Sequence, residues 1–243
     1  MDLRAGSSER RFGAYVEGLV SVISHADRAK PLRDYCRGLM LPCERKSVKP
    51  MGAMTEPERT AAQHRSLLHF VGEGRWSDAA VLTKVRQMVQ LAIERHGPIE
   101  AWIIDDTGFP KKGTHSVGVA RQYCGQLGKQ DNWQVAVSLS LANADASLPV
   151  ACQLYLPEEW TKDSDRLRKA GVPDDVGFKT KHEIALEQLR WACAAGLPRG
   201  VALRPPTPPR ASSARYSTTM GRSTGFLKFD PESGRSMGQA ESQ

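Results

Sequence analysis

The chain has 243 residues, of which 40% are hydrophobic and 25% are charged, so it can form one large globular domain or two small ones. It has no apolar run of about 18 residues to span a bilayer, and its charged N-terminus excludes a secretory signal, so we expect a cytoplasmic protein without membrane partners. The five cysteines form no CxxC pair, which excludes a zinc knuckle, and the formal charge of +7 favours polyanionic partners such as nucleic acid.

The first two predicted helices form a hairpin. Apolar residues recur at helical spacing after Ser8, which predicts a helix that begins there and buries one face. The residues on that face are Phe12, Val16, Leu19, Val20 and Ile23. Pro31 predicts the start of a second helix, because proline is tolerated in the first turn, and Pro42 ends it.

Two further helices complete a helical N-terminal region. Thr55 and Glu58 have the spacing of a capping box, in which each side chain bonds to the backbone N–H of the other residue, and they predict a third helix. Ser77 predicts the N-cap of a fourth helix, which ends at Gly97. We therefore expect residues 1–97 to form an all-helical domain.

The hydrophobic period changes to that of a strand after this region. Residues 99–104 are apolar and β-branched, and they predict a buried strand that ends at an acid pair. A hairpin of two strands and then a helix follow, at Trp133–Leu141, Pro149–Leu156 and Lys181–Ala195. This β-β-β-α order leads to a fourth strand that begins at Val201–Leu203, so residues 98–203 form a mixed α+β or α/β domain.

The fourth strand breaks after three residues. Four prolines stand between Arg204 and Arg210, and proline donates no hydrogen bond to a central strand. The composition of residues 204–243 turns to Arg, Pro, Ser, Thr and Gly, which predicts a disordered basic tail. The abrupt change favours translation out of frame from about Gly200, and the alternative is a natural basic tail.

The acid pair Asp105-Asp106 is the strongest candidate for chemistry. Two adjacent carboxylates repel each other unless each is solvated, hydrogen-bonded or bound to a cation. Carboxylates at neighbouring strand ends hold the two metal ions of phosphoryl-transfer enzymes, so either acid is a candidate metal ligand. The alternative is a solvated turn at Asp106-Thr107-Gly108.

Basic and aromatic residues follow the acid pair, and they are candidate nucleic-acid contacts. Lys111 and Lys112 are suited to hold phosphate groups next to a metal site. Arg121, Lys129 and Trp133 extend this surface, where Trp133 would stack on a base. The alternative for Trp133 is a place in the hydrophobic core.

Several motifs resemble the insertion sequence 701 group of transposases, and the resemblance covers the chain from about Phe12 to Gly200. The most specific motif is Ile104-Asp105-Asp106-Thr107-Gly108-Phe109-Pro110-Lys111-Lys112-Gly113. Similar motifs stand at Glu44–Val48, His64–Val71, Trp76–Asp78, Ser116–Lys129, Leu154–Trp160 and Gly171–Asp175.

This resemblance implies an RNase H-like domain with a DDE triad of acids. In the family, Mg²⁺ or Mn²⁺ drives hydrolysis at the ends of the element and attack of the freed 3′-hydroxyl on target DNA. The family's Asp-x-Thr pattern implies that Asp105 is the first catalytic acid and metal ligand, with Asp106 as the second choice. The helical region would help to recognise the element's ends, and the protein would act in DNA recombination at the bacterial nucleoid.

The sequence departs from the family where the second acid is expected. The family continues the fourth strand into Asp-Ala-x-Tyr-Gly, but Arg204 onward stands there, and Glu232 and Glu241 of the tail do not match the third acid. One carboxylate of three would hold metal poorly, so we expect no cleavage or strand transfer by this chain alone. The alternatives are an active transposase, if the frame is restored, and a non-catalytic regulator or inhibitor that occupies DNA ends or associates with itself or with intact transposase.

Overall fold

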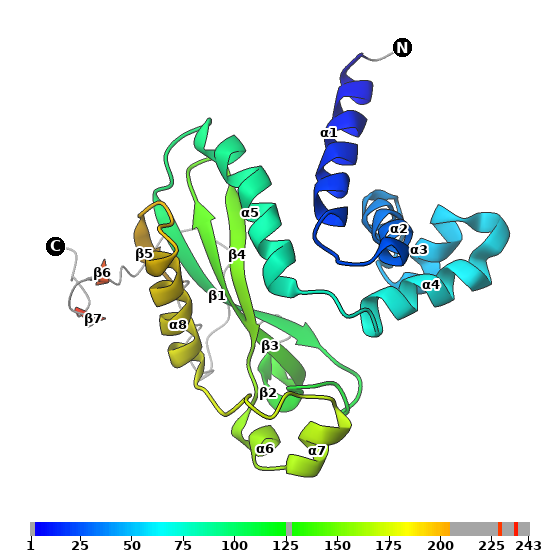
Figure 1. Cartoon of the computed structure of the whole chain (residues 1–243). Helices are drawn as coiled ribbons and strands as arrows, with labels where there is room; N and C mark the ends of the chain where they lie inside the picture. The colour runs from blue at the N-terminus through cyan, green and yellow to red at the C-terminus, as the bar shows by residue number, and fades with distance from the viewer. Residues whose placement is uncertain (1–2, 125–127, 205–227, 230–235, 238–243) are drawn as a thin grey trace. The chain divides into compact units, whose positions relative to one another are not determined.

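The chain contains two compact units, Met1–Ala92 and Ile93–Gln243. The computed structural model describes residues 3–124, 128–204, 228–229 and 236–237. In these residues the first unit is helical, and the second is a β-sheet with helices (Figure 1). None of the helices in the described ranges is both long and apolar enough to cross a membrane.

The helical unit is built around a small apolar core. Its helices are α1 (Leu3–Val20), α2 (Ala29–Met40), α3 (Val48–Thr55), α4 (Thr60–Gly72) and α5 (Asp78–Glu94), with short 3-10 helices η1 (Ala26–Arg28) and η2 (Pro57–Arg59). Leu19, Ile23, Leu32 and Phe70 form the buried centre of this core. The predicted helical periodicity is thus confirmed for the region as a whole.

Two of the predicted helix starts are wrong, and one is confirmed. α1 begins at Leu3, and the Ser8 hydroxyl accepts a hydrogen bond from the Arg11 guanidinium instead of capping the helix. Thr55 is the last residue of α3, and its hydroxyl donates back to the carbonyl of Met51 (2.9 Å) instead of capping a following helix. The Ser77 hydroxyl accepts from the backbone N–H of Ala80 (3.2 Å) at the start of α5.

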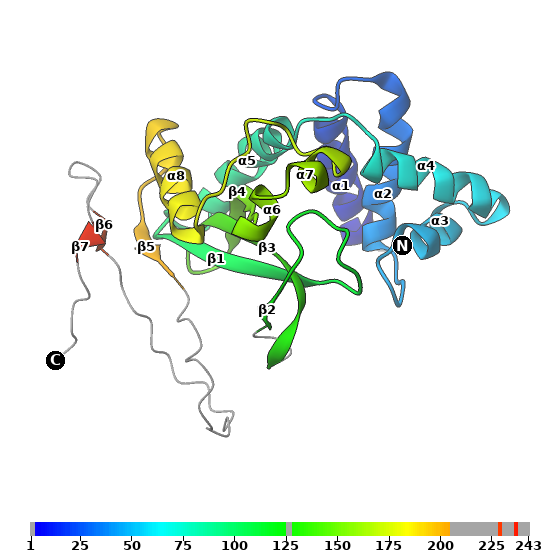
Figure 2. The same ribbon diagram turned by 90° about the horizontal axis from the view of Figure 1, so that it is seen from below.

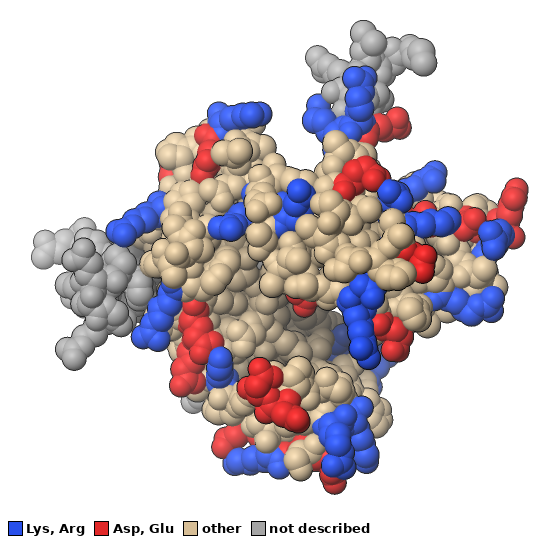
Figure 3. All heavy atoms as spheres, viewed as in Figure 1, with Lys and Arg blue, Asp and Glu red and all other residues tan. Residues whose placement is uncertain are grey.

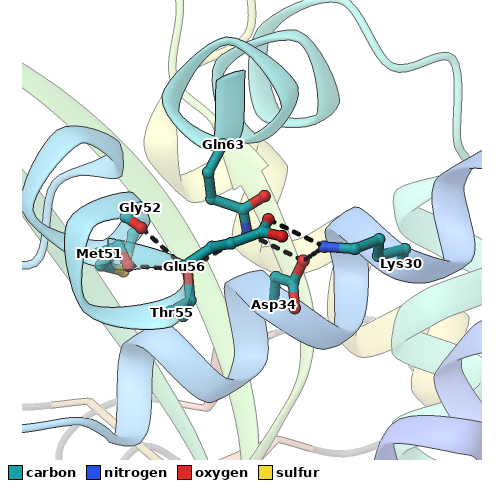
Figure 4. Close-up of polar contacts among 7 residues, drawn as sticks. All are labelled: Lys30, Asp34, Met51, Gly52, Thr55, Glu56 and Gln63. Carbon is teal, nitrogen blue, oxygen red and sulfur yellow. Dashed lines mark hydrogen bonds and ion pairs between the residues drawn. The ribbon is translucent and has the colours of Figure 1, made fainter. Parts of the chain in front are cut away.

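A polar network joins α2, α3 and α4 (Figure 4). The side-chain amide of Gln63, which is 3% exposed, donates to Asp34 Oδ2 (2.8 Å) and to Thr55 Oγ1 (3.2 Å). Lys30 donates to the same Asp34 oxygen (2.6 Å) and to Glu56 (3.3 Å). Because a buried amide must be hydrogen-bonded to offset its desolvation, this network fixes the three helices relative to one another.

The second unit is a mixed sheet. Its elements are β1 (Ala101–Pro110), β2 (Ala120–Cys124), β3 (Lys129–Ala142), β4 (Ser147–Leu154), α6 (Glu158–Thr161), α7 (Ser164–Lys169), α8 (Lys181–Ala194) and β5 (Val201–Leu203). β3 pairs antiparallel with β1 along one edge and with β2 and β4 along the other, and β5 pairs parallel to β1. α8 covers one face (Figures 1 and 2), and Gln188 donates from it to the carbonyl of Val137 (2.9 Å).

The topology agrees with the predicted order except for β2, which the sequence did not predict. Three antiparallel strands, β1, β3 and β4, precede α8 and the parallel strand β5, as expected for an RNase H-like domain. The fourth strand is described over Val201–Leu203, and the predicted break after it falls on residues that the structure does not describe beyond Arg204. Of the predicted disordered tail, the structure describes Arg204 and the two-residue strands β6 (Lys228–Phe229) and β7 (Ser236–Met237), and the rest lies outside the described residues.

Candidate active site

The acid pair lies within β1 and not at its end. The ladder between β1 and β3 continues past both acids to Pro110, which pairs with Trp133. The predicted strand end at Ile104 and the alternative of a turn at Asp106-Thr107-Gly108 are therefore both wrong, because cross-strand hydrogen bonds hold this segment extended. Side chains of successive strand residues point to opposite faces, so the two carboxylates lie on different faces of the sheet.

Asp106 lies on the face that α8 covers. Its Oδ2 is 3.1 Å from Nζ of Lys181, the first residue of α8, and the two side chains are 34% and 30% exposed. The same ammonium lies 5.4 Å from the centroid of the Tyr155 ring, within the range of a cation–π contact. Asp106 thus already has a cationic partner.

Asp105 lies on the opposite face, where its side chain is exposed. One of its carboxylate oxygens accepts the backbone N–H of Asp106 (2.8 Å), and Ser138 of β3 lies directly across from it. Within the described ranges no lysine, arginine or histidine forms an ion pair with Asp105. Both acids are exposed, and they differ in that Asp106 is paired with Lys181.

The pairing of β5 with β1 gives the register that a longer β5 would follow. The two strands pair from Ala101↔Val201 to Ile103↔Leu203, and a strand that continued in this register would bring position 205 beside Asp105. The sequence has Pro205 at that position. No carboxylate is therefore supplied where β5 would face Asp105.

The residues present do not fit a two-metal site. Such a site needs several carboxylates from neighbouring strands. Asp105 supplies one, while Asp106 points to the other face and pairs with Lys181. In the part of the chain that the structure describes, no three His, Cys, Asp or Glu side chains are placed to hold a metal ion.

The predicted nucleic-acid contacts do not share one surface. Lys112, Arg121 and Lys129 are exposed, and Lys111 is half-buried. Arg121 and Lys129 point to opposite faces of the ribbon formed by β2 and β3, as the pairing of these strands requires. Lys129 also forms an ion pair with Asp131 (3.2 Å), which offsets part of its charge.

Trp133 lies in the core, which confirms the alternative for this residue. Its side chain is 6% exposed and packs with Val135 and Tyr155. A Cβ added to Gly108 of the neighbouring strand would overlap its indole ring, so the ring fills the space that the glycine leaves. A buried ring cannot stack on a base, and Trp133 is not part of the site.

The tertiary structure adds cationic residues that sequence reasoning missed. Lys181 stands 75 residues after Asp106, so no local pattern links the two. Lysine and arginine side chains gather over α7 (Figure 3). One of them, Arg166, stacks on the Trp160 ring at 3.6 Å and donates to the carbonyl of Thr114 (2.8 Å), which joins α7 to the loop after β1.

Comparisons with known proteins agree with this arrangement. The model of a family described as DDE superfamily endonuclease matches residues 18–204, and the match ends one residue after β5. A probable transposase for insertion sequence element IS701 from Microchaete diplosiphon is 36% identical over 121 residues, which are 50% of this chain and 28% of the relative's length. No solved structure matches the chain. The resemblance to the insertion sequence 701 group is confirmed by these matches.

Proposed function

Because the chain belongs to the DDE superfamily of endonucleases, we propose that it is an insertion-sequence transposase that binds DNA but does not cleave it alone. The position of Asp105 carries this proposal. Its carboxylate is exposed on β1, which pairs with the parallel strand β5, and the sequence that follows β5 has prolines where the family has a second acid. The superfamily generally uses divalent metal ions such as Mg²⁺, which need more carboxylates than this face offers.

Asp105 is the first catalytic acid in this proposal. It matches the family's Asp-x-Thr pattern, its carboxylate is exposed, and it points away from α8. Asp106 instead holds Lys181, and a carboxylate that is paired with an ammonium is a poor metal ligand. The structure therefore supports Asp105 over Asp106.

The predicted inactivity follows from the number of acids. Two-metal catalysis needs ligands that bridge and flank both ions, so the loss of two acids of three removes the site rather than weakening it. The sequence has Pro205 and no acid at the position that would follow β5 in the register toward Asp105. Glu232 and Glu241, the acids of the tail that were considered for the third position, lie outside the described residues.

The helical unit supplies most of the affinity for duplex DNA in this proposal. Residues 1–92 contain 15 lysines and arginines against 10 acids, whereas residues 93–204 contain 14 of each. Neutralising phosphates with basic side chains releases counterions and gives sequence-independent affinity. The charge distribution thus supports sequence-independent DNA binding by the helical unit.

A change of reading frame near Gly200 accounts for the C-terminal sequence. The family match ends at residue 204, and the composition changes at the same place. Resequencing through this region and translating all three forward frames tests this part of the proposal. We expect another frame to resume with an Asp-Ala-x-Tyr-Gly strand, and its absence would support the natural basic tail instead.

A DNA cleavage assay in Mg²⁺ or Mn²⁺ tests the proposed lack of catalysis. Its substrate is a linear DNA that contains the gene and, on each side, roughly several hundred base pairs of flanking sequence. The chain as it exists is expected to bind this DNA and leave it intact. A version with the frame restored by one inserted or deleted base is expected to cut it. In that version Asp105→Asn abolishes cutting, whereas Asp106→Asn retains it.

Two outcomes would contradict the proposal. Cutting by the chain as it exists, lost on Asp105→Asn, would show that one acid is sufficient here. Loss of cutting on Asp106→Asn and retention on Asp105→Asn would move the first acid to Asp106. Circular dichroism of each variant checks that the fold is retained.

A further inference from the structure

The face of the sheet that carries Asp105 also presents two exposed aromatic rings. Phe109 lies on this face because alternate residues of β1 point the same way. The pairing of β3 with β1 and β2 continues the face to Arg121 and Tyr123 of β2. We call this surface the Asp105 face and define it by Asp105, Thr107, Phe109, Lys111, Arg121 and Tyr123.

Both rings are open to solvent. The side chains of Phe109 and Tyr123 are 45% and 46% exposed, although aromatic residues on a sheet usually pack into a core. Trp133 shows the contrast, because it lies on the opposite face of the same strands and is 6% exposed. Phe109 lies across from Gln134 and Tyr123 across from Gln130, on the two edges of β3, so the rings stand at separate points of one face. Each exposed ring offers a flat apolar surface for stacking.

Two cations accompany the rings. The backbone N–H of Lys111 donates to the carbonyl of Asn132 (3.0 Å), which extends the ladder of β1 by one residue. Arg121 pairs with Asn132 from the other edge of β3, so Lys111 and Arg121 flank it. Among the described strand residues on this face, Asp105 is the single acid, which leaves the aromatic end of the face cationic.

Aromatic rings and cations on one face are the groups that bind single-stranded nucleic acid. Unpaired bases stack on aromatic rings, whereas a duplex hides the faces of its bases. We propose that the Asp105 face binds a single strand of DNA. Phe109 and Tyr123 stack on bases, Lys111 and Arg121 contact phosphates, and the strand runs toward Asp105. This inference rests on the proposed function for the nature of the nucleic acid.

Fluorescence anisotropy with a labelled 20-nucleotide oligothymidylate and a labelled 20-base-pair duplex tests the inference on the whole chain. Phe109→Ala and Tyr123→Ala are each expected to weaken binding of the oligothymidylate about 5- to 100-fold, because stacking contributes roughly that factor per base. Binding of the duplex changes less than about twofold, because it depends on phosphate contacts of the helical unit. The matched control is Phe178→Ala, which removes a ring that is 42% exposed and lies outside the strands.

A second variant protects the test against a folding defect. Phe109→Trp keeps a stacking ring, so it is expected to retain binding and to add indole fluorescence that oligothymidylate quenches. If wild-type chain binds duplex but Phe109→Ala and Tyr123→Ala leave oligothymidylate binding unchanged, the inference is overturned and the proposed function stands. If wild-type chain binds neither DNA, the proposed DNA binding itself fails.

Discussion

The ammonium of Lys181 lies 3.1 Å from the carboxylate of Asp106 and joins the start of α8 to the centre of β1. The pair lies at the N-terminus of α8 and is partly exposed, whereas Asp105, the preceding residue, points to the opposite face. One acid of the motif therefore fixes the helix to the sheet, and the other is left for chemistry. Substitution of Asp106 is therefore expected to lower the stability of the fold, whereas substitution of Asp105 is not.

Asp106→Asn and Lys181→Met are each expected to lower the free energy of unfolding by up to about 1 kcal/mol, because a partly exposed ion pair contributes little more. The double variant should lose no more than the larger single loss, since both changes remove the same contact. Urea denaturation measures the free energy of unfolding of the two single variants and the double variant. The control is Asp105→Asn, which we expect to leave that free energy unchanged. Additive losses from Asp106→Asn and Lys181→Met would show that the pair does not stabilise the fold.

Gly108→Ala is expected to destabilise the second unit by about 1–3 kcal/mol. The added methyl group would overlap the indole of Trp133, which is buried and has little room to move. Gly113→Ala is the matched control, because a Cβ at Gly113 meets no atom within 4 Å. Thermal unfolding followed by tryptophan fluorescence compares the two, and equal melting temperatures would refute the packing described for Trp133.

Gln63→Ala is expected to cost about 1–3 kcal/mol, since it removes two hydrogen bonds from a buried network and leaves Asp34 and Thr55 with fewer partners. The control is Gln87→Ala, at an exposed position of α5. Chemical denaturation followed by circular dichroism at 222 nm reports on the helical unit. A loss no greater than that of the control would mean that the network does not hold α2, α3 and α4 together.

The ion pair between Glu17 and Arg33 gives stability that depends on pH. Arg33 donates to both carboxylate oxygens (2.6 and 2.7 Å), and this hydrogen bonding lowers the pKa of Glu17 in the folded chain. The pKa of Glu17 is therefore lower in the folded chain than in the unfolded chain. The ion pair contributes its full stability when the pH is above the pKa of the unfolded chain. The contribution is lost as the pH falls through the folded pKa.

Melting temperatures of wild type and Glu17→Gln from pH 7 down to acid therefore test this pair. We expect wild type to be the more stable at pH 7 and the difference to shrink as the pH falls below the ordinary range of a glutamate. High salt should also reduce the difference, because the pair is exposed. A difference that stays constant with pH would contradict the linkage to Glu17.

Local pattern alone was sufficient to predict much of the chain. The burial of Val16 and Leu19 on one face of α1 and the Ser77 cap of α5 depend on neighbours within one or two turns, and both are confirmed. The start of the fourth strand at Val201 was predicted as well. Its break at the prolines that follow stays a prediction. These features follow from the chemistry of adjacent residues.

The tertiary structure decided which side chains meet and which are exposed. The sequence identified the acids but not their roles, since Lys181 reaches Asp106 only after α8 packs on β1. It left Trp133 open between base stacking and the core, whereas the sheet buries that ring and exposes Phe109 and Tyr123 on the face of Asp105. The physical reason is that strand register determines which face each side chain takes, and register is fixed by pairing with strands far away in the sequence.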